Sequence, residues 1–143
     1  MQILVDTSIW SLALRRSRAQ LSEVEKTSTS ELRDFIQDGR ARLIGSVRQE
    51  LLSGIRDQAQ FERVKTYLRA FPDEPASTDD YEDAARWSNQ CRSRGIAGSG
   101  TDFLICAMAI SRGWQIFTRD DDFQTYARVI PLKLYLTGAA KPR

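Results

Sequence analysis

The chain has 143 residues, of which 41% are hydrophobic and 28% charged, and its formal net charge is +2 at pH 7. This length is typical of one domain with its own hydrophobic core, and the composition excludes a disordered chain. We therefore expect a single domain over residues 1–136 and a disordered tail over residues 137–143.

Missing residue types exclude several kinds of chemistry. The chain has no histidine, which excludes a catalytic triad with a histidine base and a histidine-ligated zinc site. Cys91 and Cys106 lack C-x-x-C spacing, so we interpret them as free, buried thiols in a reducing compartment. The apolar run 103–110 is too short to cross a bilayer, and no signal peptide precedes the first apolar run. We expect a cytoplasmic protein without a membrane partner.

The hydrophobic pattern changes repeatedly between the periods of strands and helices. In chain order it predicts strand 2–5, helix 7–14, helix 22–39, strand 41–46, helix 47–55, helix 61–71, helix 78–95, helix 103–110, strand 115–118, helix 123–127 and strand 129–136. This alternation indicates an α/β fold in which helices cover both faces of a parallel sheet.

Capping residues mark where several of the predicted helices begin. Ser22 and Glu25, three residues apart, form a capping-box pattern. Ser46 is expected to cap the helix after the second strand, and either Thr78 or Asp79 the helix after the proline-rich turn.

Prolines limit two possible strands. Pro72 and Pro75 allow at most a short edge strand in segment 72–77, because proline has no N–H for a neighbouring strand. For the same reason Pro131 assigns the last strand to an edge of the sheet.

Acidic residues stand where several elements are expected to meet one edge of the sheet. Asp6 follows the first strand, Asp102 lies at the start of the apolar helix, and Asp120, Asp121 and Asp122 follow strand 115–118. The carboxyl ends of parallel strands share one edge, and ligands bind there where the strand order reverses. We therefore expect these carboxylates to converge.

Glu50 is a fourth acidic candidate because of its place on a helix. At 100° per residue, the apolar residues of helix 47–55 form one stripe, and Glu50 borders that stripe. A carboxylate beside a buried stripe can point along the edge of the sheet, so Glu50 is not simply a remote surface charge.

Each of these acids also has a purely structural interpretation. Asp6 can be a helix N-cap, Asp102 part of a capping box begun by Ser99, Glu50 a solvated charge, and the aspartate run a turn with a cap. The functional interpretation depends on the whole set. Carboxylates held close together repel one another, so four of them on one edge need a compensating cation.

The available ligands indicate which cation this would be. Oxygen atoms without imidazole or paired thiolates favour a hard ion, Mg²⁺ or Mn²⁺. Such an ion completes its coordination with water and phosphate oxygens, and it can activate a water for attack on phosphorus. Hydrolysis of a phosphodiester is therefore the expected chemistry.

Four stretches carry a resemblance to a known family: "ILVDTSIWSLAL", "GSVRQELLSGI", "GTDFLICAMAI" and "IFTRDDDF". In order and spacing they resemble the four acidic motifs of PIN-domain ribonucleases, especially the VapC toxins of bacterial toxin–antitoxin pairs. The resemblance spans Ile3 to about Leu136. It implies a three-layer α/β/α sandwich with a parallel sheet of about five strands.

The resemblance also implies an activity and partners. It implies an endonuclease that depends on Mg²⁺ or Mn²⁺ and cuts RNA, with structured RNA such as tRNA as one possible substrate. Neutralisation by a cognate antitoxin protein and assembly into a homodimer are further expectations.

Carried over by motif, the catalytic residues would be Asp6, Glu50, Asp102 and Asp120. Of these, Asp6, Asp102 and Asp120 are expected to bind the metal directly, and Glu50 completes the site directly or through water. One of the carboxylates can take the proton from the attacking water.

Three further residues are supporting candidates. Thr118 matches the family's hydroxyl residue and would hydrogen-bond a carboxylate or a water, and Arg119 could hold the RNA backbone. The triple aspartate departs from the family pattern, so the fourth ligand is ambiguous. Asp122 is the second choice after Asp120, since the two would share a side if the strand continued, and Asp121 would point away.

Two other functions fit parts of the pattern. A PIN-like binding module without catalysis would keep its protein contacts but would be expected to have lost at least one of the four acids. A response-regulator receiver domain also carries acids at strand ends and binds Mg²⁺. It needs an acidic pair after the first strand, where Asp6 stands alone, and a lysine after the fifth strand, whereas Lys133 lies within the last predicted strand.

Overall fold

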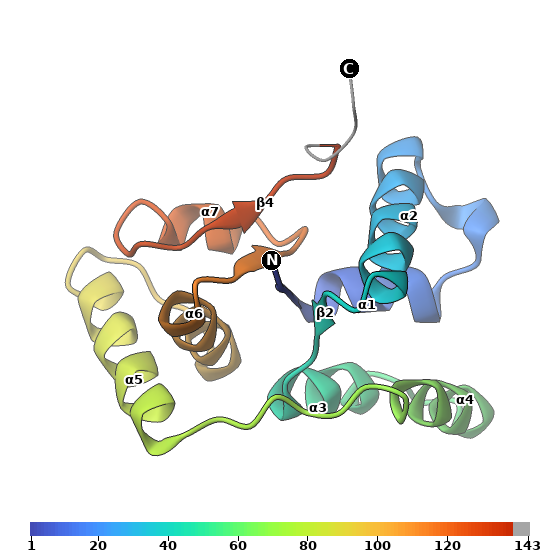
Figure 1. The fold of residues 1–143 in the computed structure, drawn as a ribbon, viewed down its shortest axis with the longest axis horizontal. Helices are drawn as coiled ribbons and strands as arrows, with labels where there is room; N and C mark the ends of the chain where they lie inside the picture. The colour runs from blue at the N-terminus through green and yellow to red at the C-terminus, as the bar shows by residue number, and fades with distance from the viewer. Residues whose placement is uncertain (139–143) are drawn as a thin grey trace.

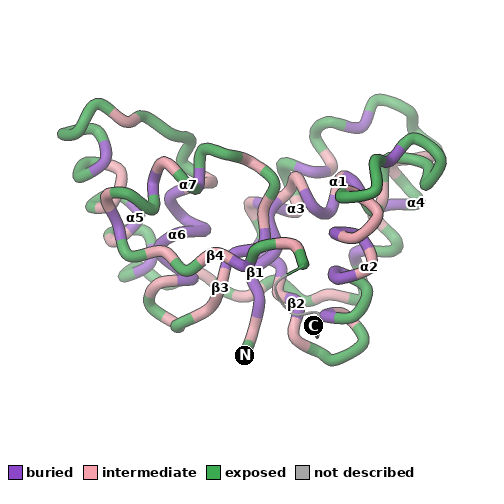
Figure 2. The backbone as a smooth tube through the Cα atoms, turned by 90° about the horizontal axis from the view of Figure 1, so that it is seen from above, coloured by how far each residue is buried: buried purple, intermediate pink, exposed green. Residues whose placement is uncertain are grey.

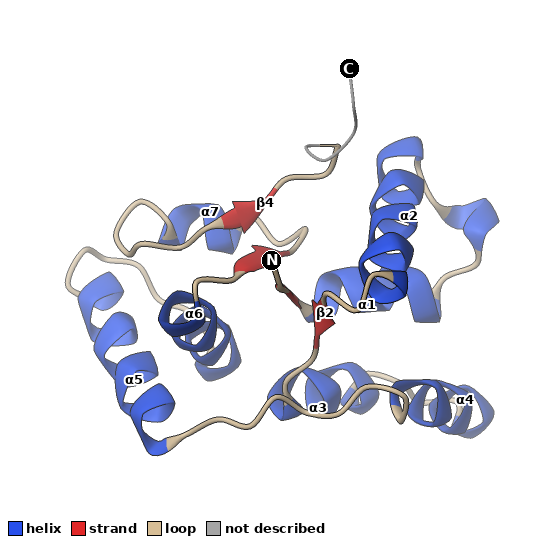
Figure 3. Cartoon of the chain, viewed as in Figure 1, coloured by secondary structure: helices blue, strands red, loops and turns tan. Residues whose placement is uncertain are grey.

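The computed structural model of the chain describes residues 1–138. Its elements in chain order are β1 (Ile3–Val5), α1 (Thr7–Arg15), the 3₁₀ helix η1 (Arg18–Gln20), α2 (Glu23–Gln37), β2 (Ala41–Arg42), α3 (Gly45–Ser53), α4 (Gln58–Leu68), α5 (Thr78–Arg92), α6 (Gly100–Arg112), β3 (Gln115–Phe117), α7 (Asp122–Tyr126) and β4 (Leu134–Tyr135). Figure 3 shows how short the strands are beside the helices that surround them. The predicted order of strands and helices is confirmed.

The sheet has four parallel strands in the order β2-β1-β3-β4. The chain passes from β1 to β2 on one side and later returns to β3 on the other side, so the strand order reverses at β1. In the register of the central pair, Val5 lies beside Phe117, and Asp6 and Thr118 therefore leave the sheet side by side. The reversal lies at the edge where the acidic residues were expected to converge.

A fifth strand is reduced to a single bridge in the described part of the chain. Leu43 and Asp73 form an isolated parallel bridge, and the N–H of Glu74 donates to the carbonyl of Leu43 at 2.8 Å. Pro72 and Pro75 flank this bridge and have no N–H to extend it. The expectation of about five strands therefore corresponds to four strands and one bridge.

Helices cover both faces of the sheet, as the alternation of elements predicted. Figures 1 and 2 both show α1, α2, α3 and α4 gathered on one side of the strands and α5, α6 and α7 on the other. Helices α5 and α6 form the most extensive helix–helix contact of the fold. The structure is therefore a three-layer α/β/α sandwich.

The core lies along the central strands and under the apolar helix. Residues Ile3 to Val5 of β1 are fully buried, and Figure 2 shows the buried backbone running through the middle of the molecule. All seven residues 103–109 of α6 are buried, which confirms the prediction of a helix covered on most sides.

Cys91 and Cys106 are free and buried, as predicted. Within residues 1–138, no helix combines the length and apolarity needed to cross a membrane.

Two of the three predicted helix caps differ from the structure. Ser22 caps α2 through the predicted capping box with Glu25. Helix α3 begins before Ser46, which lies in its first turn with a buried hydroxyl that has no hydrogen-bond partner among the described residues. Ser77 caps α5 in place of Thr78 or Asp79 because its backbone is extended and its side chain accepts from the N–H of Asp80.

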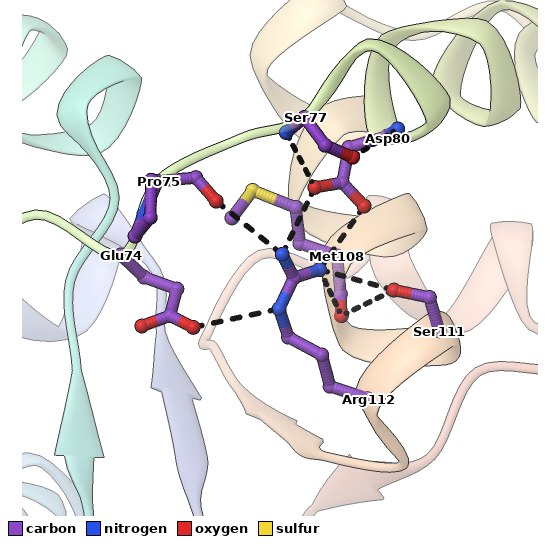
Figure 4. A network of polar contacts seen from close by, with 7 residues as sticks. All are labelled: Glu74, Pro75, Ser77, Asp80, Met108, Ser111 and Arg112. Atoms are coloured by element: carbon purple, nitrogen blue, oxygen red, sulfur yellow. Dashed lines mark hydrogen bonds and ion pairs between the residues drawn. The ribbon is translucent and has the colours of Figure 1, made fainter.

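Arg112 ties the end of α6 to α5 and to the linker before it (Figure 4). Its guanidinium donates to both carboxylate oxygens of Asp80, at 3.0 and 2.9 Å, and to the carbonyl of Pro75 at 3.3 Å. Glu74 approaches the same guanidinium at 3.6 Å. The hydrogen bonds from Arg112 hold the pKa of the buried Asp80 carboxyl at about 2, and this ion pair stabilises the α5–α6 pair.

The predicted disordered tail falls mostly outside the described residues. Its first two residues are held against α2: the hydroxyl of Thr137 lies 2.8 Å from that of Ser28, and the N–H of Gly138 donates to Glu31 at 2.9 Å. The remainder, residues 139–143, lies outside the described part of the chain.

Candidate metal centre

The predicted acidic residues line one cleft of about 470 Å³ at the carboxyl edge of the sheet. The acids in its lining are Asp6, Glu50, Asp102, Asp120 and Asp122, and hydroxyl residues Thr7, Ser8, Ser11 and Ser99 complete it. These residues come from the ends of β1 and β3 and from the N-terminal parts of α1, α6 and α7, with Glu50 further along α3. The structure therefore brings together acids that are more than 100 residues apart in the sequence.

Asp6 is the most deeply buried acid of the cleft, with 4% of its surface exposed. It occupies the N-cap position of α1 but makes no capping hydrogen bond with its side chain. Its Oδ2 instead accepts hydrogen bonds from the hydroxyls of Thr118 at 2.8 Å and Ser8 at 2.9 Å. The interpretation of Asp6 as a simple cap therefore does not describe what its carboxylate does.

The two hydroxyls connect Asp6 to the loop that carries the aspartate run. Thr118 Oγ1 accepts from the backbone N–H of Asp120 at 3.0 Å, and Ser8 Oγ accepts from the backbone N–H of Arg119 at 2.9 Å. Each hydroxyl thus donates to the carboxylate and accepts from the loop, which fixes its proton toward Asp6. The position of the loop relative to β1 is set by the same contacts.

Ser8 is a site residue that the sequence analysis did not single out. The available signal was its place two residues after Asp6, in the first turn of a helix, where its side chain can return to the end of the strand. Thr118 was predicted, and its hydrogen bond to a carboxylate has the form that the resemblance implied.

Asp102 combines a structural role and a place in the cleft. Its backbone N–H donates to the hydroxyl of Ser99 at 3.0 Å, so it does take part in the predicted N-terminal cap of α6. Its half-buried carboxylate is left for other contacts, and Oδ2 accepts a hydrogen bond from the phenol of Tyr126 at 2.7 Å. The cap and the site are therefore formed by different atoms of the same residue.

Burial raises the pKa of both inner carboxyls above the ordinary value of 3.8. For Asp6 the rise is opposed by the hydrogen bonds from Thr118 and Ser8. For Asp102 it is opposed by the hydrogen bond from Tyr126 and increased by the negative charges of Asp6 and Asp120. The pKa of the buried Tyr126 phenol is also raised, so Tyr126 stays a donor to Asp102. The cleft therefore holds negative charge that is only partly compensated by the protein.

The tightest cluster of carboxylates consists of Asp102, Asp120 and Asp122, which each offer one oxygen within 4.8 Å of the other two. Asp120 Oδ1 also accepts from the backbone N–H of Asp122 at 2.9 Å, as the turn-and-cap interpretation predicted. Asp121 is exposed and lies outside this cluster. The structure thus places Asp120 and Asp122 in the cluster and Asp121 outside it.

The condition attached to the expectation for Asp122 is not met. Asp122 was expected to share a side with Asp120 if the strand continued, whereas β3 ends at Phe117 and α7 begins at Asp122. A turn followed by the first residue of a helix brings Asp120 and Asp122 together, and Asp122 lies in the cluster itself.

Glu50 lies at the exposed side of the cleft. Its Oε1 accepts a hydrogen bond from the hydroxyl of Thr7 at 2.6 Å, and it is outside the cluster of three aspartates. Arg119 is exposed and does not line this cleft; it lines a neighbouring hollow of about 220 Å³ with Thr118 and Asp120. The structure places Glu50 at the mouth of the cleft and Arg119 beside it.

A family model described as the PIN domain matches residues 3–129 of the chain. No curated protein matches the sequence. The match covers all four acidic stretches named above.

Several solved structures have the same fold. The structure of FitAcB from Neisseria gonorrhoeae aligns with a TM-score of 0.71 at 19% identity, covering 94% of this chain and 97% of that chain. VapBC2 from Rickettsia felis, bound to a DNA fragment from its promoter, aligns with a TM-score of 0.71 at 16% identity, covering 94% and 98%. VapBC-5 from Mycobacterium tuberculosis, a member of a family of toxin–antitoxin systems, aligns with a TM-score of 0.64 at 18% identity, covering 94% and 98%.

Proposed function

The chain belongs to the PIN domain family, and from this premise we propose that it is a Mg²⁺- or Mn²⁺-dependent endoribonuclease and the toxin of a toxin–antitoxin pair. The observation that carries the proposal is the cluster of Asp102, Asp120 and Asp122 oxygens within 4.8 Å of one another, in the cleft that Asp6 also lines. Fold alone would not assign a reaction.

The residues present suit a hard divalent cation. Every candidate ligand is a carboxylate oxygen, and the spacing of the cluster allows three of them to approach one ion. Asp102 and Asp120 are proposed as direct ligands because they belong both to the acidic motifs and to the cluster. Asp6 is proposed as the third ligand from its motif, and Asp122 as an additional one from its position.

A bound Mg²⁺ or Mn²⁺ would supply a water of lowered pKa and neutralise the charge that develops on the leaving oxygen. The protein's own residues orient the reactants. Ser8 and Thr118 hold the carboxylate of Asp6 in one position, and the exposed Glu50 is available at the mouth of the cleft to take a proton from the attacking water. Arg119, beside the cleft, is proposed to contact the RNA backbone.

The proposed chemistry fixes the ends of the products. Attack by water on phosphorus, without participation of a ribose hydroxyl, leaves a 5′-phosphate and a 3′-hydroxyl. Structured RNA such as tRNA is proposed as the substrate.

The proposed partners are a cognate antitoxin protein and a second copy of the chain. The antitoxin is supported by two structural relatives, one described as a toxin–antitoxin complex from Klebsiella pneumoniae and one, VapBC-5, as a member of a family of toxin–antitoxin systems. A homodimer and a cytoplasmic location are proposed from the resemblance to VapC toxins.

The proposal is tested by incubating the purified protein with structured RNA in Mg²⁺ or Mn²⁺ and in EDTA. We expect cleavage only with the metal, with 5′-phosphate and 3′-hydroxyl ends, and its loss in Asp6→Asn. Ends with a 2′,3′-cyclic phosphate would contradict hydrolysis by an activated water.

A catalytically inactive PIN-like binding module is the alternative that the same experiment addresses. Such a protein would bind an antitoxin and leave RNA uncut in every metal. The presence of all four motif acids in one cleft favours the enzyme.

A further inference from the structure

We propose that Tyr126 is a positioning residue for Asp102, and that Gly98 is a glycine because it must make room for the hydroxyl of Tyr126. The inference rests on the proposed function, since it assigns Tyr126 to the orientation of a metal ligand. Neither residue belongs to the four acidic stretches, and both act through contacts that the sequence spacing does not reveal.

The hydroxyl of Tyr126 makes a directed contact with the cleft. Tyr126 ends α7, is 1% exposed, and donates to Asp102 Oδ2 at 2.7 Å across a sequence separation of 24 residues. Its ring is held by Phe103 of α6 and by Phe123 of its own helix, with centroid distances of 4.9 and 5.4 Å. Packing therefore aims the hydroxyl, and solvent does not compete for it.

Gly98 lies directly against this hydroxyl. A Cβ atom at Gly98 would lie 2.2 Å from Tyr126 Oη, 2.7 Å from Cζ of the same ring and 2.9 Å from Cε2 of Phe103. Gly98 does not have a positive φ, unlike Gly95 in the same loop. Backbone conformation thus gives no reason for a glycine at 98, whereas the close approach of Tyr126 does.

The contact has a consequence for binding a cation. A carboxylate that is free to rotate loses freedom when it becomes a ligand, and a hydrogen bond that fixes it beforehand reduces that loss. Helix α7 contributes twice to the proposed metal site. Asp122 at its start lies in the cluster, and Tyr126 at its end holds Asp102. The packing of Tyr126 on Phe103 also sets the distance between α7 and α6.

The test is the affinity of the full chain for Mn²⁺ without RNA, measured by calorimetry, for wild type and Tyr126→Phe. Phenylalanine keeps both ring contacts and removes only the hydroxyl. We expect the Kd for Mn²⁺ to rise about 10- to 100-fold, the usual range when a residue that orients a ligand is removed. Melting temperatures in EDTA show that the variant is folded.

Tyr135→Phe is the matched control. Tyr135 is also buried and also donates to a carboxylate, Glu31 of α2, which does not line the acidic cleft. This variant is expected to bind Mn²⁺ like wild type, even where its melting temperature falls.

Gly98→Ala is the second variant, and it should weaken Mn²⁺ binding by displacing the Tyr126 hydroxyl. In the Tyr126→Phe background the same substitution should weaken binding by a smaller factor, because the closest clashing atom is gone. Wild-type affinity in folded Tyr126→Phe, or in folded Gly98→Ala, would overturn the positioning role. If wild type itself bound no Mn²⁺, the proposed metal site would fail, and the positioning role with it.

Discussion

Asp6 shows how single residues determine the properties of the cleft. The carboxylate is almost fully buried, and the hydroxyls of Ser8 and Thr118 donate to the same oxygen. Burial raises the pKa of Asp6, and these two hydrogen bonds oppose the rise. Removing a hydroxyl should therefore make the carboxylate harder to ionise and less well oriented for a cation.

Thr118→Val tests this directly, because valine has nearly the same shape and lacks the hydroxyl. We predict that cleavage at a fixed, subsaturating Mn²⁺ concentration falls about 10- to 100-fold, measured by initial rates on labelled RNA. Thr118→Ser, which keeps the hydroxyl, should retain most of the activity. Equal rates for valine and threonine would show that the hydrogen bond to Asp6 is not required.

The aspartate run gives a second prediction at the scale of residues. Asp120→Asn and Asp122→Asn should each reduce cleavage, with the larger loss at Asp120, whereas Asp121→Asn should cut RNA at close to the wild-type rate. The reason is that only Asp120 and Asp122 lie in the carboxylate cluster with Asp102. Comparable losses in all three variants, measured in parallel, would argue against this division of the triplet.

A residue of the cleft could be predicted from the sequence where it stands at the end of a strand or at the start of a helix. Asp6, Asp102 and the aspartate run were identified because each stands at such a position. The contacts of Tyr126 with Asp102 and of Ser8 with Arg119 each depend on how two elements pack. The hydrophobic periodicity of the segments does not predict such packing. The positions of the acids were therefore foreseen, and most of the groups that hold them were not.

At the scale of elements, the α5–α6 pair depends on an ion pair with little exposure to solvent. The side chain of Asp80 is 5% exposed and that of Arg112 is 23% exposed. Hydrogen bonds from Arg112 lower the pKa of Asp80 from 3.8 to about 2. A carboxyl with a lowered pKa stabilises the fold at pH values above 3.8, and this contribution is lost as the pH falls through about 2.

Asp80→Asn is accordingly predicted to lower the free energy of unfolding at pH 7 by about 2 kcal/mol. The difference from wild type should shrink as the pH falls from about 4 toward 2. Urea denaturation at several pH values measures both effects. Asp79→Asn removes an exposed charge from the same turn and should change stability by less than about 0.5 kcal/mol. An equal effect of the two substitutions would contradict the role given to Arg112.

The order of the elements followed from the sequence, but several of their ends did not. Ser46 and Ser77 show why helix ends were hard to predict, since a serine beside a predicted helix can be its cap or lie in its first turn. The residue at which the helix begins depends on where the preceding segment leaves the sheet. The proline segment was predicted to form at most an edge strand, and the bridge between Leu43 and Asp73 is the part of that strand which two prolines permit.

At the scale of the whole molecule, the ionised carboxylates of the cleft oppose folding. Because the pKa values of Asp6 and Asp102 are raised, the folded protein binds protons more tightly than the unfolded chain. In the absence of a cation, the free energy of unfolding therefore falls as the pH rises above 3.8 through the raised pKa values. A cation that binds the ionised carboxylates should restore this stability.

Mn²⁺ is therefore predicted to raise the melting temperature at neutral pH. At a concentration of a hundred times its Kd, it should add about 3 kcal/mol to the free energy of unfolding. This stabilisation should diminish as the pH falls toward 4, because protons compete for the same oxygens. Thermal unfolding with and without Mn²⁺ at several pH values measures it. An equal shift in wild type and Asp102→Asn would place the bound ion elsewhere.

The layered architecture was the most predictable level, since alternating strands and helices leave few arrangements other than a parallel sheet with helices on both faces. The strand order was not predictable from the pattern, and it places the reversal of the chain at β1, beside Asp6. That single topological fact brings the acids of distant segments to one cleft, where the proposed reaction takes place.

The most direct test of this reaction is single-turnover cleavage of structured RNA in Mn²⁺ by wild type, Asp102→Asn and Asp121→Asn, prepared in parallel. The two variants lose the same charge, one from the carboxylate cluster and one beside it. We predict that wild type and Asp121→Asn cut at similar rates, that Asp102→Asn does not cut, and that EDTA stops all cleavage. Cleavage by Asp102→Asn at the wild-type rate would contradict the assignment of the acidic cleft as the active site.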